Sequence, residues 1–284
     1  MIDDSIPTPQ DFGLPIHYRP RQWSALWEQA PGDWRKLLAS ALDCDLGSHH
    51  PNLFFRADDI GAGGRAFQAL CRLFRDHQIP LAMAVVPAWL TDIRTRQLFA
   101  AAPLEESLWG WHQHGWRHVN CQRTGEKSEF GEQRPAEKQS RDIGMGLKKM
   151  NEIFGKRLVP VFTPPWNRLP TATLRILQEL NFKAVSMTRP IPSTTKSGIG
   201  LRNLRIQLDL HTRKAKDGYA DFHNLMGELS GLMTKREPVG IMVHHQRMPL
   251  FAFEFLSELL NLLKHHVGAQ FLSFADLLGD EYDK

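Results

Sequence analysis

The sequence predicts an α/β fold in which helices cover a parallel sheet. From residue 52 onward, short apolar runs with strand character alternate with longer stretches that have helical spacing. Polar and ionisable residues follow five of these runs, at the end of the strand where parallel α/β folds place their sites. No glycine-rich dinucleotide turn is present. Seven or eight strand–helix units of this kind favour a barrel over an open dinucleotide-binding sheet.

The expected elements follow from local patterns. The segment 65–77 has apolar residues at helical spacing, a proline opens the helix expected at 135–154, and β-branched residues dominate 239–243. Strands are expected at residues 53–55, 81–86, 108–111, 159–162, 183–187, 204–208, 239–243 and 270–273. Helices are expected at residues 65–77, 135–154, 171–180, 220–233 and 251–265.

Residues 1–50 differ from the rest of the chain. They hold Trp23, Trp27 and Trp34, five prolines, and helical patterns at 21–29 and 33–42. A segment this short cannot bury a core of its own. We therefore expect a helical extension that packs on a barrel domain formed by residues 51–284. Packing in cis, shielding of the site and a dimer contact all remain open as its role, and the oligomeric state is open.

Composition excludes several function classes. Lys and Arg number 35 against 31 Asp and Glu, which gives a net charge of +4. The densest basic stretch, 202–216, also contains Asp209 and His211, so it is interpreted as a solvated face and no nucleic-acid partner is expected. No run is long enough for a membrane span, and the N-terminus lacks the pattern of a signal peptide. Three cysteines without metal-type spacing indicate reduced thiols and a cytoplasmic protein.

Asp58 and Asp59 form an acidic pair after the first apolar run. Adjacent carboxylates can divide two tasks, because one can bind a cation while the other accepts a proton. Taken alone, an Asp-Asp-x-Gly sequence is equally typical of a turn or a helix cap.

His114 and His118 have the i, i+4 spacing that lets two imidazoles share a cation. With Asp59 they make two histidines and one carboxylate, a ligand set found at catalytic zinc and non-haem iron sites. An isolated pair of this spacing could also be surface or capping histidines. His112 could be an extra ligand, but a supporting or packing role is preferred.

Two further segments carry candidate chemistry. His244 and His245 end a buried-looking strand, where one imidazole could protonate a leaving amine or hydrogen-bond to the backbone of the core. Pro164 and Pro165 stiffen the backbone before Trp166, so that the Trp166 N–H could stabilise an oxyanion. A rigid turn with a core tryptophan is the alternative.

The order of these motifs resembles the polysaccharide deacetylase family, the NodB homology domain of the carbohydrate esterases. The resemblance covers residues 51–275 and extends to a divergent intracellular branch of that family. It rests on four motifs in the family's order, which are Phe55-Arg56-Ala57-Asp58-Asp59, His114-Gly115-Trp116-Arg117-His118, Thr163-Pro164-Pro165-Trp166 and Met242-Val243-His244.

The resemblance implies a distorted (β/α)7 barrel and metal-dependent hydrolysis of a C–N amide bond. It implies Asp58 as catalytic base, His244 as general acid and the Trp166 N–H as oxyanion donor. The implied metal ligands are Asp59, His114 and His118. Substrate-binding or supporting roles are expected for His112, Pro165, Asn167, Arg168, Asp209 and His245.

The expected cofactor is one divalent metal ion, with zinc preferred over cobalt, nickel, manganese or iron. The expected substrate is an N-acetylated sugar or saccharide conjugate. Two alternatives are a small cyclic or linear amide hydrolysed on the same barrel, and an inactive barrel that binds carbohydrate without turnover.

The sequence departs from the family pattern at four places. Thr163 stands where the family has an Arg that braces the catalytic Asp, and Arg56 and Arg168 are the candidates to replace it. The Asp-x-x-Asp-Trp motif that orients the acid histidine is not evident, and Asp209 is the candidate substitute. His245 stands where an Asp is frequent, and Gly115 stands where Ser or Thr is usual.

Overall fold

The computed structural model describes residues 7–20, 22–191 and 200–279. Its centre is a parallel sheet in the order β6-β5-β4-β3-β2-β1-β8-β7, with β9 paired to β1. The strands are β1 (Asn52–Ile60), β2 (Leu81–Val85), β3 (Trp109–His114), β4 (Leu158–Thr163), β5 (Ala184–Val185), β6 (Arg202–Asn203), β7 (Ile206–Asp209), β8 (Val239–Val243) and β9 (Gln270–Phe271).

One extended segment joins the two edges of this sheet. β6 pairs with β5, while β7, which begins three residues after β6 ends, pairs with β8. The backbone N–H groups of Leu204 and Ile206 continue the pairing toward Val185 and Met187. The single strand expected at 204–208 is therefore wrong in its bounds. This segment pairs first with β5 and then with β8, so that it joins the two edges of the sheet and curls it into the distorted barrel.

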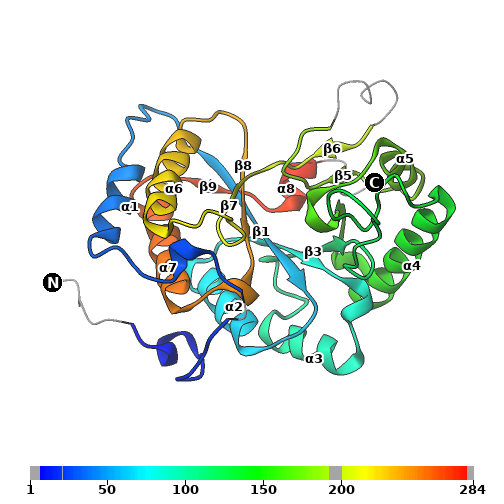
Figure 1. Ribbon diagram of the computed structural model, residues 1–284, viewed down its shortest axis with the longest axis horizontal. Coiled ribbons are helices and arrows are strands. Elements are labelled where there is room, and N and C mark those ends of the chain that lie inside the picture. Colours follow the sequence, from blue (N-terminus) through cyan, green and yellow to red (C-terminus); the bar gives the residue numbers. More distant parts are fainter. Residues whose placement is uncertain (1–6, 21, 192–199, 280–284) are drawn as a thin grey trace.

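Helices cover the outside of the sheet. They are α1 (Trp34–Leu42), α2 (Arg65–His77), α3 (Asp92–Ala101), α4 (Ala136–Phe154), α5 (Thr171–Glu179), α6 (Gly218–Met233), α7 (Leu250–His265) and α8 (Phe274–Leu278). Figure 1 shows α1, α6 and α7 gathered on one side and α4 and α5 on the opposite side. Sequence patterns missed α3, where Leu98 is the one buried residue, and α8, which is only five residues long.

Strands β1 and β3 run further than their apolar residues. β1 continues through Arg56, Asp58 and Asp59, and β3 continues to His114. The side chains of Arg56, Asp58 and His114 are buried. The expectation that these polar groups follow the strands is therefore wrong by a few residues. Asp58, Asp59 and His114 lie among the last residues of the strands themselves, and the register of β1 with β2 shifts between Ala57 and Ile60, where the two aspartates lie.

The N-terminal residues pack into the same core as the barrel. Trp27, Trp34 and Leu38 are buried in one cluster with residues of α6 and α7. The helix expected at 33–42 is present as α1, whereas 21–29 contains only the short 3₁₀ turn η2 (Ala25–Trp27), with residue 21 outside the described part. The boundary at residue 50 stays a prediction.

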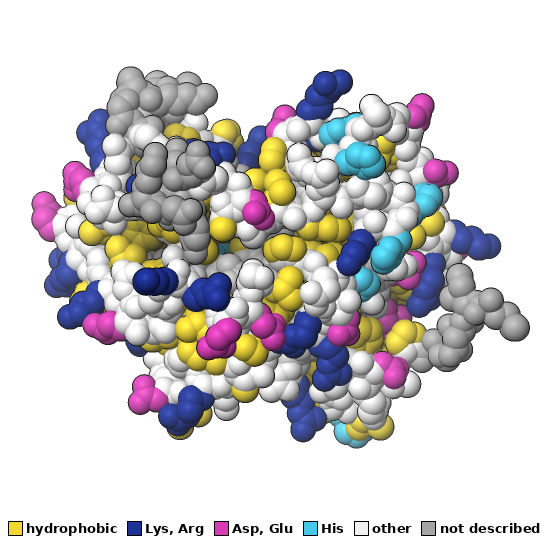
Figure 2. Space-filling model, turned by 180° about the vertical axis from the view of Figure 1, so that it is seen from behind, with side chains coloured by type: hydrophobic (Ala, Val, Ile, Leu, Met, Phe, Trp, Pro, Cys, Tyr) yellow, Lys and Arg dark blue, Asp and Glu magenta, His cyan; other side chains and the backbone are white. Residues whose placement is uncertain are grey.

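The surface carries charges of both signs. On the face in Figure 2, basic and acidic side chains are interspersed. None of the helices in the described part of the chain combines the length and hydrophobicity needed to cross a bilayer.

Candidate active site

Asp59, His114 and His118 converge at the ends of β1 and β3. Asp59 Oδ1 lies 3.3 Å from His114 Nε2 and 3.1 Å from His118 Nε2. Each side chain offers one ligand atom, and the three atoms lie within 4.8 Å of one another. Despite these distances Asp59 Oδ1 is buried without a hydrogen bond. A buried carboxylate oxygen facing two imidazole nitrogens in this way fits a divalent cation such as zinc.

The β4 backbone aims His114 at Asp59. His114 Nδ1 lies 2.9 Å from the Thr163 carbonyl oxygen, an acceptor, so the proton belongs on Nδ1. The Nε2 lone pair is then free to face Asp59, as a metal ligand requires. Thr163 thus contributes through its backbone, although its side chain replaces the arginine of the family pattern.

His118 is presented by a loop wrapped around Glu129. The Glu129 carboxylate accepts the backbone N–H groups of Trp116, Arg117 and His118 at 3.1, 2.7 and 3.2 Å. Burial raises the pKa of Glu129. Sequence reasoning missed Glu129, because it lies eleven residues beyond His118 and no motif connects the two.

Gly115 is required by the geometry of this loop. Its φ is +57°, which favours glycine. A Cβ at this position would collide with the Glu129 carboxylate and the Pro165 ring. The departure from the Ser or Thr of the family pattern is thus explained by close packing of the β3 and β4 loops.

Arg56 is the brace of Asp58. Its Nε and Nη2 donate to the two carboxylate oxygens of Asp58 at 2.7 and 2.9 Å, and Nη2 also donates to Asn167 Oδ1 at 2.9 Å. Arg56 and Asp58 are two residues apart on one strand, so both face the same side of the sheet. Arg168 instead bonds Glu126 at 2.8 Å and is excluded as the brace.

The electrostatics separate the two adjacent carboxyls. Burial alone would raise the pKa of Asp58, but the Arg56 guanidinium outweighs it and holds the pKa below its usual range. For Asp59 the two neighbouring imidazoles likewise outweigh burial and lower the pKa. Both groups are therefore ionised at neutral pH, with different partners.

The two imidazoles of the cluster are not equivalent. Burial tends to lower the pKa of His114, but contact with the Asp59 carboxylate raises it overall. Burial and the charge of His114 lower the pKa of His118 to about 4. Of the two imidazoles, His114 is thus the one whose positive charge the Asp59 carboxylate favours, and a divalent cation bound here would compete with its proton.

The backbone of the site is held in an uncommon conformation. Asp59, His118, Trp166 and Asn167 all have φ between +55° and +61°, and they are four of the six non-glycine residues with positive φ in the described part of the chain. Such residues cost about 1–3 kcal/mol each and cluster at functional sites. The Trp166 ring lies 4.6 Å from the His118 ring. No acceptor among the described residues receives the Trp166 backbone N–H.

The histidines after β8 differ in their surroundings. His244 is buried, its Nδ1 has no partner among the described residues, and its backbone N–H donates to His211 Nδ1 at 3.2 Å. Asp209 accepts hydrogen bonds from the backbone N–H groups of His211 and Thr212, so its carboxylate stabilises the turn that directly follows it. The expectation that Asp209 orients His244 is thus wrong, and the residue that contacts His244 from this loop is His211, through the His244 backbone. Burial lowers the pKa of His245 to about 4, and its ring packs against Phe67.

His112 has a supporting role. Its Nδ1 lies 3.1 Å from the Gly110 carbonyl oxygen and its Nε2 lies 3.0 Å from Thr163 Oγ1. The ring packs on Phe274, and burial lowers its pKa to about 3. His112 therefore links β3 to β4 as an uncharged group and does not join Asp59, His114 and His118 in the group that could hold a metal ion.

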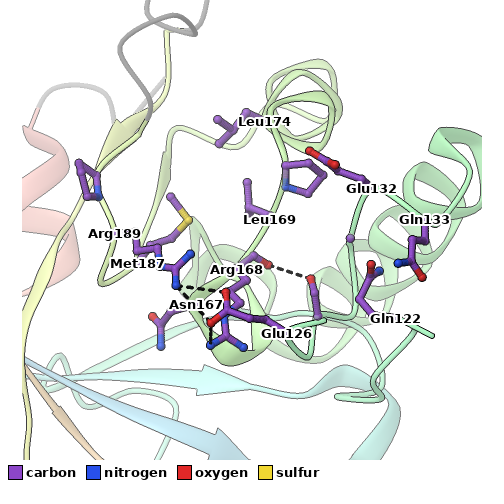
Figure 3. Close-up of a pocket in the computed structure, with 14 residues that line it drawn as sticks. Gln122, Glu126, Glu132, Gln133, Asn167, Arg168, Leu169, Leu174, Met187 and Arg189 are labelled. Carbon is purple, nitrogen blue, oxygen red and sulfur yellow. Dashed lines mark hydrogen bonds and ion pairs between the residues drawn. The ribbon is translucent and has the colours of Figure 1, made fainter. Parts of the chain in front are cut away.

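A cavity of about 460 Å³ adjoins the site, and its lining does not include Asp59, His114 or His118. Asn167, which bonds Arg56, is one of its lining residues and connects the two. Figure 3 shows Arg168 and Arg189 directed at Glu126 on one side of this cavity, with Glu132 and Gln133 on the other. Asn167 and Arg168 thus line this cavity, whereas Asp59, His114 and His118 do not.

Comparison with known proteins establishes the fold. No protein-family model matches the chain, and no curated protein resembles it in sequence. Several solved structures, by contrast, have a similar fold. One is described as a polysaccharide deacetylase from Mycobacterium smegmatis, with a TM-score of 0.56, 11% identity and coverage of 83% of this chain and 91% of that one. Another is the Puue allantoinase, with a TM-score of 0.55, 14% identity and coverage of 92% of this chain and 96% of that one.

The peptidoglycan N-acetylglucosamine deacetylase Bc1960 is also similar, with a TM-score of 0.50, 13% identity and coverage of 79% of this chain and 86% of that one. At these identities the similarity shows the fold. The chain has the distorted (β/α)7 barrel of the polysaccharide-deacetylase type, and the prediction of this fold is confirmed.

Proposed function

We propose that this protein is a metal-dependent hydrolase that cleaves a C–N amide bond. The observation that carries the proposal is the division between two adjacent carboxylates. Asp59 faces His114 and His118, whereas Asp58 is held by Arg56. A purely structural acidic pair has no need of two buried partners of such different chemistry.

Asp59, His114 and His118 would hold the cation, which supplies Lewis acidity to the amide carbonyl and to the attacking water. Asp58, kept ionised by Arg56, accepts the proton that the water loses as its oxygen bonds to the carbonyl carbon.

The Trp166 N–H donates to the oxyanion that forms on the carbonyl. His244 gives a proton to the nitrogen as the C–N bond breaks, so that the products are a carboxylic acid and an amine.

An N-acetylated sugar or saccharide conjugate is the proposed substrate. The cavity beside Asn167 combines polar and charged side chains with apolar ones, and a sugar likewise presents hydroxyl groups beside apolar ring faces. The fold is shared with an N-acetylglucosamine deacetylase and also with an allantoinase, so cyclic and linear amides belong in the same substrate screen.

The first experiment measures metal content after purification without chelator. We expect about one divalent ion per wild-type chain and loss of that ion in the His114→Ala, His118→Ala double variant. The matched control is the His223→Ala, His265→Ala double variant, which removes two exposed histidines and should keep the metal. A wild type that stays metal-free after incubation with zinc would overturn the proposal.

The second experiment separates a catalyst from an inactive carbohydrate-binding barrel. Asp58→Asn should abolish release of acetate from an N-acetylated chito-oligosaccharide, or of amine from the amide panel, while metal content stays at the wild-type level. Metal binding without turnover of any amide would favour the inactive barrel. Full activity in Asp58→Asn would remove Asp58 as the base.

A further inference from the structure

The segment immediately before and within η2 packs behind the loop that follows β7. The Trp27 indole N–H donates to the Leu210 carbonyl oxygen at 2.8 Å, and the Ser24 hydroxyl donates to the His211 carbonyl oxygen at 3.1 Å. Trp27 is 1% exposed, as is His211, and their ring centroids are 5.5 Å apart. Two side chains of the N-terminal region thus fix two successive carbonyl groups of this loop.

The same loop fixes the backbone of His244. His211 Nδ1 accepts the His244 backbone N–H at 3.2 Å, and the His244 carbonyl oxygen accepts the Arg247 N–H at 2.9 Å. Both polar backbone groups of His244 are therefore held, and only the side-chain torsions remain free. A contact chain runs from Trp27 through His211 to the residue proposed as general acid.

His211 must be neutral to play this part. A protonated imidazole would present an N–H to the His244 N–H, and the hydrogen bond would be lost. Burial, with smaller contributions from the neighbouring imidazoles of His244 and His245, keeps the pKa of His211 well below its usual value. No carboxylate side chain of the described residues hydrogen-bonds to the His211 ring.

We propose that His211 is a positioning residue for His244, and that Ser24 and Trp27 hold it in place, so that the N-terminal segment belongs to the proton-donating side of the active site. This inference rests on the proposed function, in which His244 protonates the leaving amine. It assigns a role to a segment outside the barrel and explains how the chain functions without the Asp-x-x-Asp-Trp motif.

Comparing substrates with different leaving groups separates a positioning role of His211 from a purely structural one. A structural defect should slow both substrates equally. An amine leaving group needs the proton from His244, whereas 4-nitrophenolate departs from 4-nitrophenyl acetate without one. His211→Leu should lower kcat on an N-acetylated chito-oligosaccharide by at least about 10-fold, which is part of the roughly 100- to 10,000-fold that a general acid contributes. It should change 4-nitrophenyl acetate hydrolysis by less than about 3-fold, well below that range. His244→Ala should show the same selectivity.

Conservative variants serve as controls. His211→Asn keeps an acceptor at the position of Nδ1 and should recover most of the amide activity. Trp27→Phe keeps an aromatic ring but removes the indole donor, so it should lower the amide rate selectively. Trp34→Phe makes the same change at a buried tryptophan that packs on Phe251 and Phe255, and both rates should be unchanged. Equal loss of amide and ester activity in His211→Leu would overturn the proposal.

Hydrogen exchange decides the positioning role even without turnover. Exchange of the His244 backbone amide should be faster in His211→Leu and Trp27→Phe than in wild type, and close to wild type in His211→Asn and Trp34→Phe. Unchanged exchange in His211→Leu would sink the inference. Faster exchange in His211→Leu, together with a wild type that hydrolyses neither probe, would instead refute the proposed hydrolase while leaving the contact chain in place.

Discussion

At the scale of single residues, the site depends on side chains and glycines that hold other groups in place. Arg56 fixes both oxygens of Asp58, and the Thr163 carbonyl fixes the ring of His114. Gly115 lets the His118 loop pass between Glu129 and Pro165. Arg56 and Thr163 contact residues of the proposed active site and Gly115 shapes the loop of one, but none of the three reacts itself, and this explains why their sequence signals are weak.

Gly115→Ala tests the close packing of this loop. We expect a loss of about 2 kcal/mol or more in the free energy of unfolding, because positive φ and steric overlap both oppose a Cβ here. Gly125→Ala is the matched control, since Gly125 also has positive φ, +81°, but a Cβ there would meet no atom within 4 Å. Urea unfolding of both variants separates the two costs, and equal losses would show that overlap contributes nothing.

At the scale of elements, the loop after β3 is organised by one buried carboxylate. Three consecutive N–H groups point at Glu129, and this sets the left-handed conformation of His118. The loop after β4 is similarly stiff, with Pro164 and Pro165 preceding two residues of positive φ. The two loops meet where the Trp166 ring lies against His118, so metal binding should respond to changes in either.

Glu129→Gln should weaken metal binding about 10- to 100-fold. A glutamine side chain has one oxygen and one NH2 group, so it cannot accept all three backbone N–H groups, and His118 loses its fixed position. Competition with a chromophoric chelator measures the affinity. Glu132→Gln makes the same change at an exposed position three residues away and should leave the affinity unaltered. An unchanged affinity in Glu129→Gln would mean that His118 does not need this support.

At the scale of the whole molecule, the N-terminal segment and the barrel share one core, and several buried histidines are kept neutral by it. Trp27 and Trp34 pack on Phe255 and Phe251 of α7, and Phe251 in turn stacks on Phe222 of α6. Burial lowers the pKa values of His112, His211 and His245. These imidazoles take up protons more readily in the unfolded chain than in the folded protein, so acid should favour unfolding.

The pH dependence of stability tests this directly. A group whose pKa is depressed on folding contributes stability that is present above its unfolded value of about 6.5 and is lost as the pH falls. Between pH 7.5 and 5.5, His211 alone should account for about 1 kcal/mol of the loss in unfolding free energy. His211→Asn should reduce the wild-type loss by that amount in urea titrations at the two pH values. An identical slope in the variant would mean that His211 is not held neutral by folding.

The sequence by itself determined the class of fold and the members of the candidate site. Alternating strand and helix periods predict the parallel sheet, and the four motifs name Asp58, Asp59, His114, His118, Trp166 and His244. These signals are local, because each motif occupies a few neighbouring residues at the end of one strand. The periods and motifs can therefore be detected without knowing the partners of each strand.

Only the tertiary structure decided what supports the site. The pairing of Arg56 with Asp58 could be suspected from their spacing, but Arg168 was equally eligible until its contact with Glu126 was seen. The supporting contacts join residues far apart in the sequence: 11 residues separate Glu129 from His118, 33 separate His211 from His244, and 183 separate Trp27 from Leu210. No local sequence pattern encodes such separations. Long-range partners are chosen by the packing of the whole chain, which follows from the sum of many weak contacts.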